Sequence, residues 1–325
     1  MALPNANFDD VVTTTLRKRT KKLKDNVTQN TALLFRLKEK GRMRTFSGGR
    51  TIVEEIAFSG PGNYTRYSGY DPISIAQGDM LTAAEYNIKQ AAVSISMSGL
   101  DQLQNAGEEA TINLLGARIQ QAEREMVNGL SADIYSNGTA SGGKQIGGLQ
   151  LGISDDGTGT VGGIVSGTYT WWKNQFYDFS AAVGAPTPGP STIQTAMNTL
   201  YFACSRNRDQ PDLIVADDIY YGYYLQSLQA IQRVTNDKLA SAGFQNLKFM
   251  GADVVFDGGL GGDAPASHMY FVNSDFMHWR PHASRDMEVL SPDRHATNQD
   301  AFVRIIGWAG NMTYSGRQFT GVIVA

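Results

Sequence analysis

The clearest periodic pattern along the chain lies between residues 100 and 135, a stretch without proline. Apolar residues recur there at spacings of three and four, at Ile112, Leu115, Ile119, Ala122, Met126, Leu130 and Ile134. This spacing predicts one apolar stripe on an α-helix, which Asn137-Gly138 would end. Thirty or so residues at about 1.5 Å each form a rod of roughly 45–50 Å. A coiled coil is the alternative, but three glycines and the lack of a sustained heptad favour a rod laid across a sheet.

A pattern of period two precedes this helix. Ile52, Glu54 and Ile56 alternate with residues of the opposite face, which is typical of a strand, although Glu54 interrupts its apolar side. Five turn-forming residues, 59–63, end that strand, and a second alternation runs from Ala91 to Met97. We therefore predict that residues 50–98 form a long two-stranded ribbon, with Tyr64, Tyr67 and Tyr70 near its tip. Isolated hairpins are marginal in water, so such a ribbon implies a partner surface.

The remaining apolar pattern predicts a second body built from helices and strands. Leu33, Leu34, Phe35 and Leu37 form a packing group before Gly41, where we expect any helix to stop. Beyond the proline-rich residues 186–190, Ser191 caps an expected helix whose inner face is Ile193, Met197, Leu200 and Cys204. A buried strand at 211–216, a helix at 219–233 capped by Asp217, and strands at 247–250, 254–256 and 269–272 follow. This mixture predicts an α/β or α+β body of about 100 residues.

Composition narrows the class of protein. The chain has 325 residues, of which 18% are charged and 42% hydrophobic, which excludes a highly charged disordered chain. Its length suggests about two domains. No run of about 18 apolar residues is present, and the first ten residues do not resemble a secretory signal, so we expect a soluble protein made in the cytoplasm. A single cysteine, Cys204, excludes an internal disulfide and a multi-thiolate metal site.

Charge is distributed unevenly along the chain. Residues 1–50 contain 12 Lys and Arg and four acidic residues, a net charge of +8, whereas the remaining 275 residues carry −11. The basic residues concentrate in 17–24, Arg-Lys-Arg-Thr-Lys-Lys-Leu-Lys. One interpretation is that this segment contacts a polyanion or the acidic surface of another copy. The other interpretation is that it is a solvated helix face.

Two glycine-rich motifs resemble nucleotide-binding loops but lack their context. Gly157-Thr-Gly159-Thr-Val-Gly162 matches the dinucleotide fingerprint, yet Asp155-Asp156 precedes it in place of a strand. Gly142-Gly143-Lys144-Gln145 lacks the Ser or Thr of a phosphate loop. Four tyrosines, at 220, 221, 223 and 224, offer rings that stack on nucleic-acid bases, or that pack on both sides of a helix and at subunit contacts.

Candidate catalytic chemistry is sparse. Among His268, His278, His282 and His295, only 278 and 282 have the i, i+4 spacing of a helical metal site, and Pro281 disfavours that helix. The side chains of Asp275, His278, Asp286 and Glu288 are of the types that bind a metal ion from a loop, so a metal-dependent hydrolase is the alternative from another class of function. The Gly-x-Ser-x-Gly nucleophile elbow of hydrolases is not present in the sequence. Cys204 is predicted to be a small core residue and not a nucleophile. We therefore predict no catalytic, cofactor or metal residues and no enzymatic activity.

The order of these parts resembles the major capsid proteins of tailed double-stranded-DNA bacteriophages, which have the Hong Kong 97 fold. The matching stretches are the ribbon at 50–98, the helix at 100–136 with its exit at 137–149, the helix–strand–helix run 191–233 and the ending 305–319. The resemblance implies an α+β fold with an N-terminal arm (1–49), an extended loop (50–98), a peripheral domain with a spine helix (99–184), an axial domain (185–285) and returning peripheral strands (286–325).

The same resemblance implies function and partners. It implies hexamers and pentamers that form an icosahedral shell around the phage genome, assembled in the host cytoplasm and located in the virion. Scaffolding, portal and decoration proteins are possible partners, DNA contact is weak and nonspecific, and no membrane is involved. The basic arm is expected to pair with the acidic loop or body of a neighbouring copy. Residues 51–88 contain no lysine, so we expect a shell without covalent crosslinks through this loop. An encapsulin-type compartment, which shares the fold, is the alternative.

Overall fold

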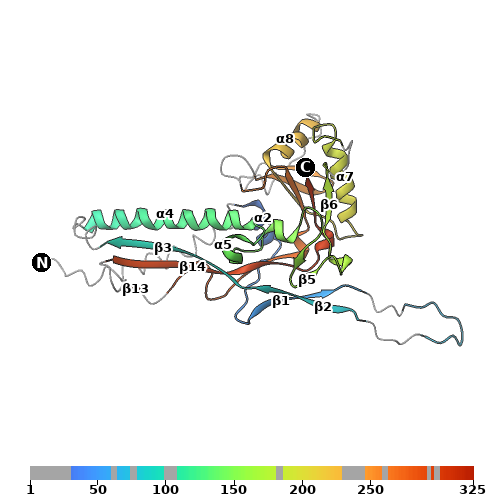
Figure 1. Cartoon of the computed structure of the whole chain (residues 1–325), viewed down its shortest axis with the longest axis horizontal. Helices are drawn as coiled ribbons and strands as arrows, with labels where there is room; N and C mark the ends of the chain where they lie inside the picture. The colour runs from blue at the N-terminus through green and yellow to red at the C-terminus, as the bar shows by residue number, and fades with distance from the viewer. Residues whose placement is uncertain are drawn as a thin grey trace.

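Two sheets, each assembled from strands that are far apart in the sequence, form the frame of the molecule (Figure 1). The computed structural model describes residues 31–59, 64–73, 79–98, 108–180, 186–228, 246–257, 263–290, 294–295 and 301–325. The basic segment 17–24 and residues 100–107 of the predicted rod lie outside these ranges, so the expectations for them are not addressed by the fold.

The long sheet is organised around β14 (Ala301–Tyr314). On one side, β3 (Lys89–Ser98) pairs antiparallel with it, from Lys89 opposite Gly310 to Ser98 opposite Ala301. On the other side, three strands follow one another along β14: β11 (Met277–Pro281), β12 (Glu288–Val289) and β13 (Arg294–His295). β14 is thus a central strand in this part of the sheet.

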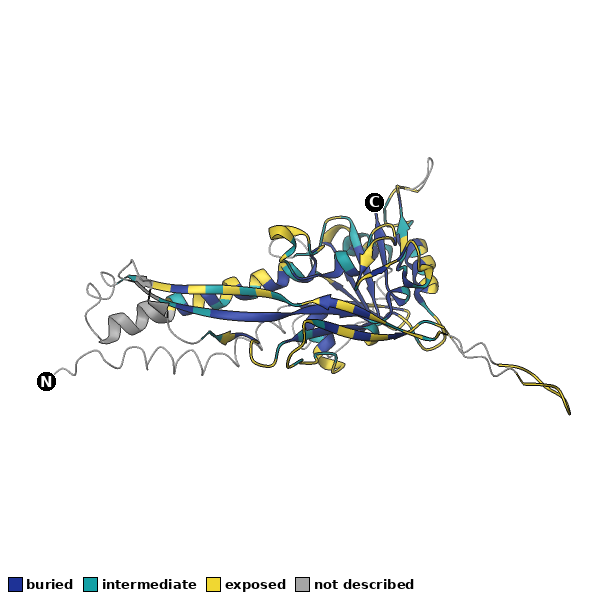
Figure 2. Ribbon diagram, turned by 60° about the horizontal axis from the view of Figure 1, so that its bottom comes forward, coloured by how far each residue is buried: buried dark blue, intermediate teal, exposed yellow. Residues whose placement is uncertain are grey.

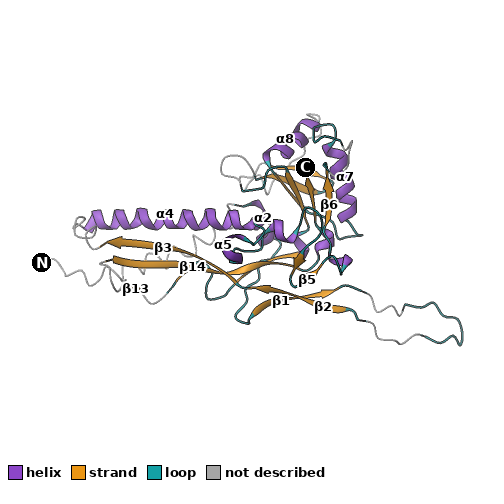
Figure 3. Cartoon of the chain, in the orientation of Figure 1, coloured by secondary structure: helices purple, strands orange, loops and turns teal. Residues whose placement is uncertain are grey.

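Helix α4 (Glu108–Ile134) lies along the long sheet, as the sequence predicts (Figure 3). Its 27 residues correspond to about 40 Å. The predicted stripe is confirmed from residue 119 onward, since Ile119, Ala122, Met126, Leu130 and Ile134 are all buried. No helix in the described ranges is long and apolar enough to cross a membrane.

The ribbon is shorter than predicted. β1 (Thr51–Ala57) pairs antiparallel with β2 (Leu81–Asn87), with Thr51 opposite Asn87 and Ala57 opposite Leu81. The prediction that the alternation Ala91–Met97 is the second strand of the ribbon is wrong, because this stretch belongs to β3 and pairs with β14. Apart from Leu81 at its exposed end, β2 carries small or polar residues and one Tyr, so its own alternation is weak, whereas β3 must pack on α4 and alternates clearly.

The second sheet has six strands, in the order β6 (Gln175–Asp178), β15 (Gly321–Val324), β10 (His268–Val272), β7 (Leu213–Ala216), β9 (Ala252–Phe256) and β8 (Asn246–Phe249). Helices α7 (Ile193–Cys204) and α8 (Asp218–Ser227) cover one face of it. The other face packs on the core beneath α2 and α4, so its central strands are buried on both sides. Burial on both faces explains their continuous apolar runs, such as 213–216.

The chain end does not return as predicted. We expected residues 286–325 to belong to the sheet that carries the long helix, but β15 inserts into the six-stranded sheet between β6 and β10. In addition, β11 begins the return at Met277 rather than at residue 286. A four-residue apolar strand carries no information on which of two sheets it joins, so only the tertiary pairing decides this.

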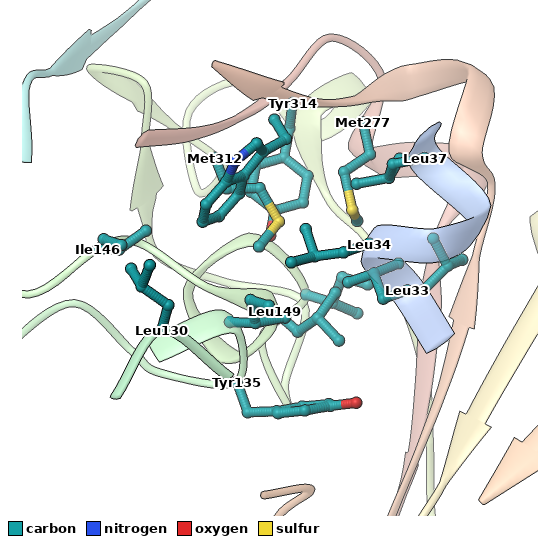
Figure 4. Packing of buried hydrophobic residues seen from close by; sticks show 14 of the residues in the cluster. Leu33, Leu34, Leu37, Leu130, Tyr135, Ile146, Leu149, Met277, Met312 and Tyr314 are labelled. Carbon is teal, nitrogen blue, oxygen red and sulfur yellow. The ribbon is translucent and has the colours of Figure 1, made fainter. Parts of the chain in front are cut away.

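Helix α2 (Ala32–Glu39) packs at the junction of the two sheets. Leu33, Leu34 and Leu37 are fully buried there, against residues from α4, β11 and β14 (Figure 4). The predicted packing group is therefore confirmed for its three leucines, whereas Phe35 is half-buried. Gly41, with φ +66°, follows the helix. The connection between α4 and β6 contains only short elements: α5 (Ala140–Gly143), α6 (Leu149–Gly152), β4 (Thr160–Val161), β5 (Ile164–Val165) and a 3-10 turn at Thr170–Trp172.

The two predicted helix caps have different outcomes. Asp217 caps α8, because its side chain accepts a hydrogen bond of 2.9 Å from the amide of Tyr220. Ser191 does not cap α7, since the helix begins one residue later than that prediction requires, with Thr192 as its N-cap. The Thr192 hydroxyl instead donates to the carbonyl of Thr187 at 2.9 Å and secures the turn before the helix.

We predict that Gly148→Ala strongly destabilises the protein, whereas Gly129→Ala stabilises it. A Cβ at Gly148 would lie 2.2 Å from the carbonyl oxygen of Ile134, so the end of α4 would have to move. The expected loss is roughly 2–3 kcal/mol in free energy of unfolding. Gly129 lies within α4 with nothing near its missing Cβ, and alanine there should add about 0.5–1 kcal/mol. Urea unfolding of both variants checks this, and equal midpoints would contradict the close approach.

Candidate functional site: the projecting ribbon and its anchor

The residues that the sequence offers for metal chemistry do not form a site. His278 is buried in β11, Asp275 forms an ion pair of 2.6 Å with Arg42, and Glu288 is exposed in β12. Among the described residues, no group of three or more His, Cys, Asp or Glu side chains is placed to hold a metal ion. Cys204 is buried on the inner side of α7, and burial raises the pKa of its thiol.

The tyrosines of α8 divide between core and surface. Tyr220 and Tyr224 are buried, and the Tyr224 hydroxyl donates to the carbonyl of Lys248 at 2.8 Å. Tyr221 and Tyr223 are half-buried. The two buried rings thus pack within the body and are not available for stacking on bases.

Among the described residues, the ribbon is a surface that the fold leaves unpartnered. β1 and β2 leave the body together, and residues 64–73 lie at the far end (Figures 1 and 2). Tyr64 is 84% exposed and Tyr67 64% exposed, and Tyr70 is also fully in solvent. A local hydrogen bond stabilises the turn here, because the Ser68 amide donates to the Asp71 carboxylate at 2.9 Å. Large apolar rings gathered on a projection indicate a surface that another molecule covers.

A buried ion pair fixes the base of the ribbon. The Arg280 Nε of β11 donates to Glu54 Oε1 at 2.6 Å, and the Thr313 hydroxyl of β14 donates to the same oxygen at 2.8 Å. Glu54 is only 7% exposed and stands between the buried Ile52 and Ile56 on the inner face of β1. The interruption of the apolar pattern at Glu54 was thus the sequence signal of this anchor.

The strand β2 is held by backbone and ring contacts. The Tyr86 hydroxyl donates to the Tyr314 carbonyl at 2.8 Å and accepts from the Tyr314 amide at 3.1 Å. The Glu85 amide donates to the carbonyl of Gly162 at 2.9 Å, in the tight turn between β4 and β5.

That turn gives the glycine motif its structural role. Gly162 and Gly163 have φ of +60° and +77°, as a two-residue hairpin turn requires. A Cβ on Gly162 would lie 2.6 Å from that of Ala84 in β2. The motif is therefore a turn that packs against the ribbon base, and not a loop between a strand and a helix.

Ionisation at this anchor is strongly perturbed. Burial alone would raise the pKa of Glu54, but hydrogen bonds from Arg280 and Thr313 and the charge of Arg280 outweigh it and lower that pKa. Burial lowers the pKa of His278 to about 4, and although Glu54 opposes this, Arg44, Arg280 and Arg42 add to it. At neutral pH the anchor therefore combines an ionised Glu54 with a neutral His278.

Two other buried arginines join segments that are distant in sequence. Arg36 of α2 contacts the buried carboxylate of Asp253 and lies 3.4 Å from that of Asp212, which ties α2 to the six-stranded sheet. Arg317 is fully buried and donates to the carbonyls of Gly152 and Trp172 and to Asn174 Oδ1. Burial lowers the pKa of Arg317 to about 10. Neither arginine stands in a sequence pattern that reveals its burial.

No model of a known protein family matches the sequence, and no curated protein matches it. Solved structures do match. A chain of the capsid asymmetric unit of cyanophage A-1(L) is 16% identical with a TM-score of 0.65, and the match covers 87% of this chain and 90% of that one. The capsid of the native GTA particle gives 11% identity and a TM-score of 0.58 over 89% of both chains. A chain of Gordonia phage Cozz gives 10% identity and 0.56, over 89% and 85%. The likeness shows a mixed helix-and-sheet fold shared with phage capsid proteins.

We predict that acid weakens the anchor of the ribbon. Below about pH 6.5 the unfolded chain protonates His278 while the folded chain does so only near pH 4, so stability falls as pH falls through this window. Glu54, whose pKa is lowered, adds a loss in the same direction at still lower pH. His278→Gln should remove roughly 2–3 kcal/mol of the difference between pH 7.5 and 4.5.

Urea unfolding at the two pH values measures this difference. His282→Gln, at the end of the same strand and half-exposed, is the matched control and should keep the pH dependence of the wild type. An unchanged pH dependence in His278→Gln would show that other groups cause the acid sensitivity.

Proposed function

We propose that this chain is the major capsid protein of a tailed double-stranded-DNA bacteriophage, and that hexamers and pentamers of it form an icosahedral shell around the genome. The observation that carries the proposal is the match to capsid chains over nearly the full length of both partners. The exposed ribbon supports the proposal, because a two-stranded projection is marginally stable in water unless another surface covers it.

The proposed domain organisation follows the Hong Kong 97 arrangement, with adjusted boundaries. The long sheet with α4 is the peripheral domain, and the six-stranded sheet with α7 and α8 is the axial domain. The axial domain then also includes β6 and β15, two strands that lie outside the predicted range 185–285. Residues 1–49 are the proposed arm, and α2 within it packs on the body.

The role is structural. Identical copies in a closed ring use heterologous contacts, in which one surface of a copy meets a different surface of the next. A ribbon enlarges such contacts beyond what the body alone offers, toward the roughly 800 Å² per partner of a stable interface. Portal, scaffolding and decoration proteins are the further partners that this role implies, together with weak contact to packaged DNA.

Electron microscopy of the purified full chain, expressed alone and with its genomic neighbours, tests the proposal. We expect uniform shells or capsomer-sized rings. A variant with Tyr64, Tyr67 and Tyr70 replaced by Ser should lose assembly by more than about tenfold while it folds normally, because the exposed rings are interface anchors. Phe202→Ser, an equally exposed ring on α7, is the matched control. A wild-type chain that stays monomeric under all these conditions would sink the proposal.

We also predict that the mature shell contains no covalent ladder. Residues 51–88, which include the ribbon, contain no lysine. The next lysine is Lys89, and its ammonium group donates a hydrogen bond to the carbonyl of Gly143. Denaturing gels of mature particles should therefore show a single band at the size of one chain, and bands at its multiples would contradict the prediction.

A further inference from the structure

The outer face of the ribbon base is acidic and apolar. The residues of β1 and β2 that point away from the body include Val53, Glu55, Leu81 and Glu85, with Val53 directly opposite Glu85. Leu81 is 73% exposed, and Val53 is nearly half exposed. The two glutamates are diagonal neighbours, about 7–8 Å apart, and neither forms an ion pair with a described residue.

An edge of the long sheet carries the opposite charge. Residues 42–46 run parallel to β11 as the outermost backbone, with the Arg44 amide bonded to the Trp279 carbonyl at 3.0 Å and the Phe46 amide to that of Pro281 at 3.2 Å. Met43 and Phe46 pack inward, and Arg44 is exposed. Arg50 lies between this segment and Thr51, the first residue of β1, and Arg285 follows β11; both are exposed. We name Arg44, Arg50 and Arg285 the arginine edge.

The arginines of this edge have no carboxylate partner among the described residues, unlike the neighbouring Arg42 and Arg280. Arg42 is paired with Asp275, and Arg280 with Glu54. By contrast, Arg44, Arg50 and Arg285 make no ion pair within the described ranges. The two surfaces thus carry complementary charge, yet no ion pair joins them within the described residues of one copy.

We propose that the outer face of the ribbon base docks on the arginine edge of a second copy of this chain. The inference rests on the proposed function, since it names the two surfaces of a contact between copies. Guanidinium groups pair with carboxylates through two parallel hydrogen bonds, which fixes the register of the ribbon as well as attracting it. Leu81 and Val53 supply the apolar part of the contact, which a polyanion such as DNA does not complement.

Charge reversal on both surfaces tests this docking. One variant combines Glu55→Lys and Glu85→Lys, a second combines Arg44→Glu, Arg50→Glu and Arg285→Glu, and a third carries all five changes. We expect each of the first two to lower the yield of shells by more than about tenfold, because like charges then face each other. The third variant should restore shells, and a mixture of the first two should restore six-membered rings, in which the two variants can alternate. Glu125→Lys and Lys144→Glu, exposed elsewhere, are the matched controls.

The outcomes separate the docking from the proposed function. If the wild type forms shells and the first two variants form them equally well, the docking is wrong while the capsid function stands. If circular dichroism shows that the first two variants fold, but neither their mixture nor the variant with all five substitutions recovers assembly, the two surfaces do not meet. Normal shells from the arginine variant, with weaker binding of a DNA duplex at low salt, would assign the edge to nucleic acid and also overturn the docking. Loss of wild-type assembly itself would refute the capsid function.

Discussion

A two-stranded ribbon that projects into solvent has no core of its own, so its direction is decided where its base meets the body. Here the inner face of β1 carries a carboxylate, Glu54, that is bound by Arg280 of β11 and Thr313 of β14. β2 is joined to the same strand β14 through Tyr86. Both strands of the ribbon are therefore tied to one sheet where the ribbon leaves the body.

Buried charge is costly, and this protein uses it where segments distant in sequence meet. Arg36 joins α2 to Asp253 of β9 and to Asp212 just before β7, and Arg317 joins the chain end to the segment that precedes β6. Each guanidinium group offers five donors, which several acceptors from different segments can satisfy together. Removing one partner leaves an uncompensated charge, so such contacts penalise alternative arrangements of the segments more strongly than apolar packing does.

The fold and the proposed assembly follow the same logic. The body completes two cores, one on each side of the six-stranded sheet, and these are independent of any partner. The ribbon instead exposes tyrosines, leucine and glutamates that no described part of the same copy covers. A shell built from identical copies needs this combination of a stable body and an unsatisfied projection, since a surface that is satisfied within one copy cannot drive association.

The sequence by itself determined the elements whose periodicity is strong: the stripe of α4 from Ile119 to Ile134, the strand β1, the helix α7 and the cap at Asp217. The sequence also showed that Glu54 interrupts an apolar strand face, but not that Arg280 and Thr313 bind it. Only the tertiary structure decided that residues 91–97 pair with β14, that β15 joins the six-stranded sheet, and that Arg317 is buried. The physical reason is that periodicity reports which side of an element is buried, whereas the identity of the partner depends on contacts between residues hundreds of positions apart.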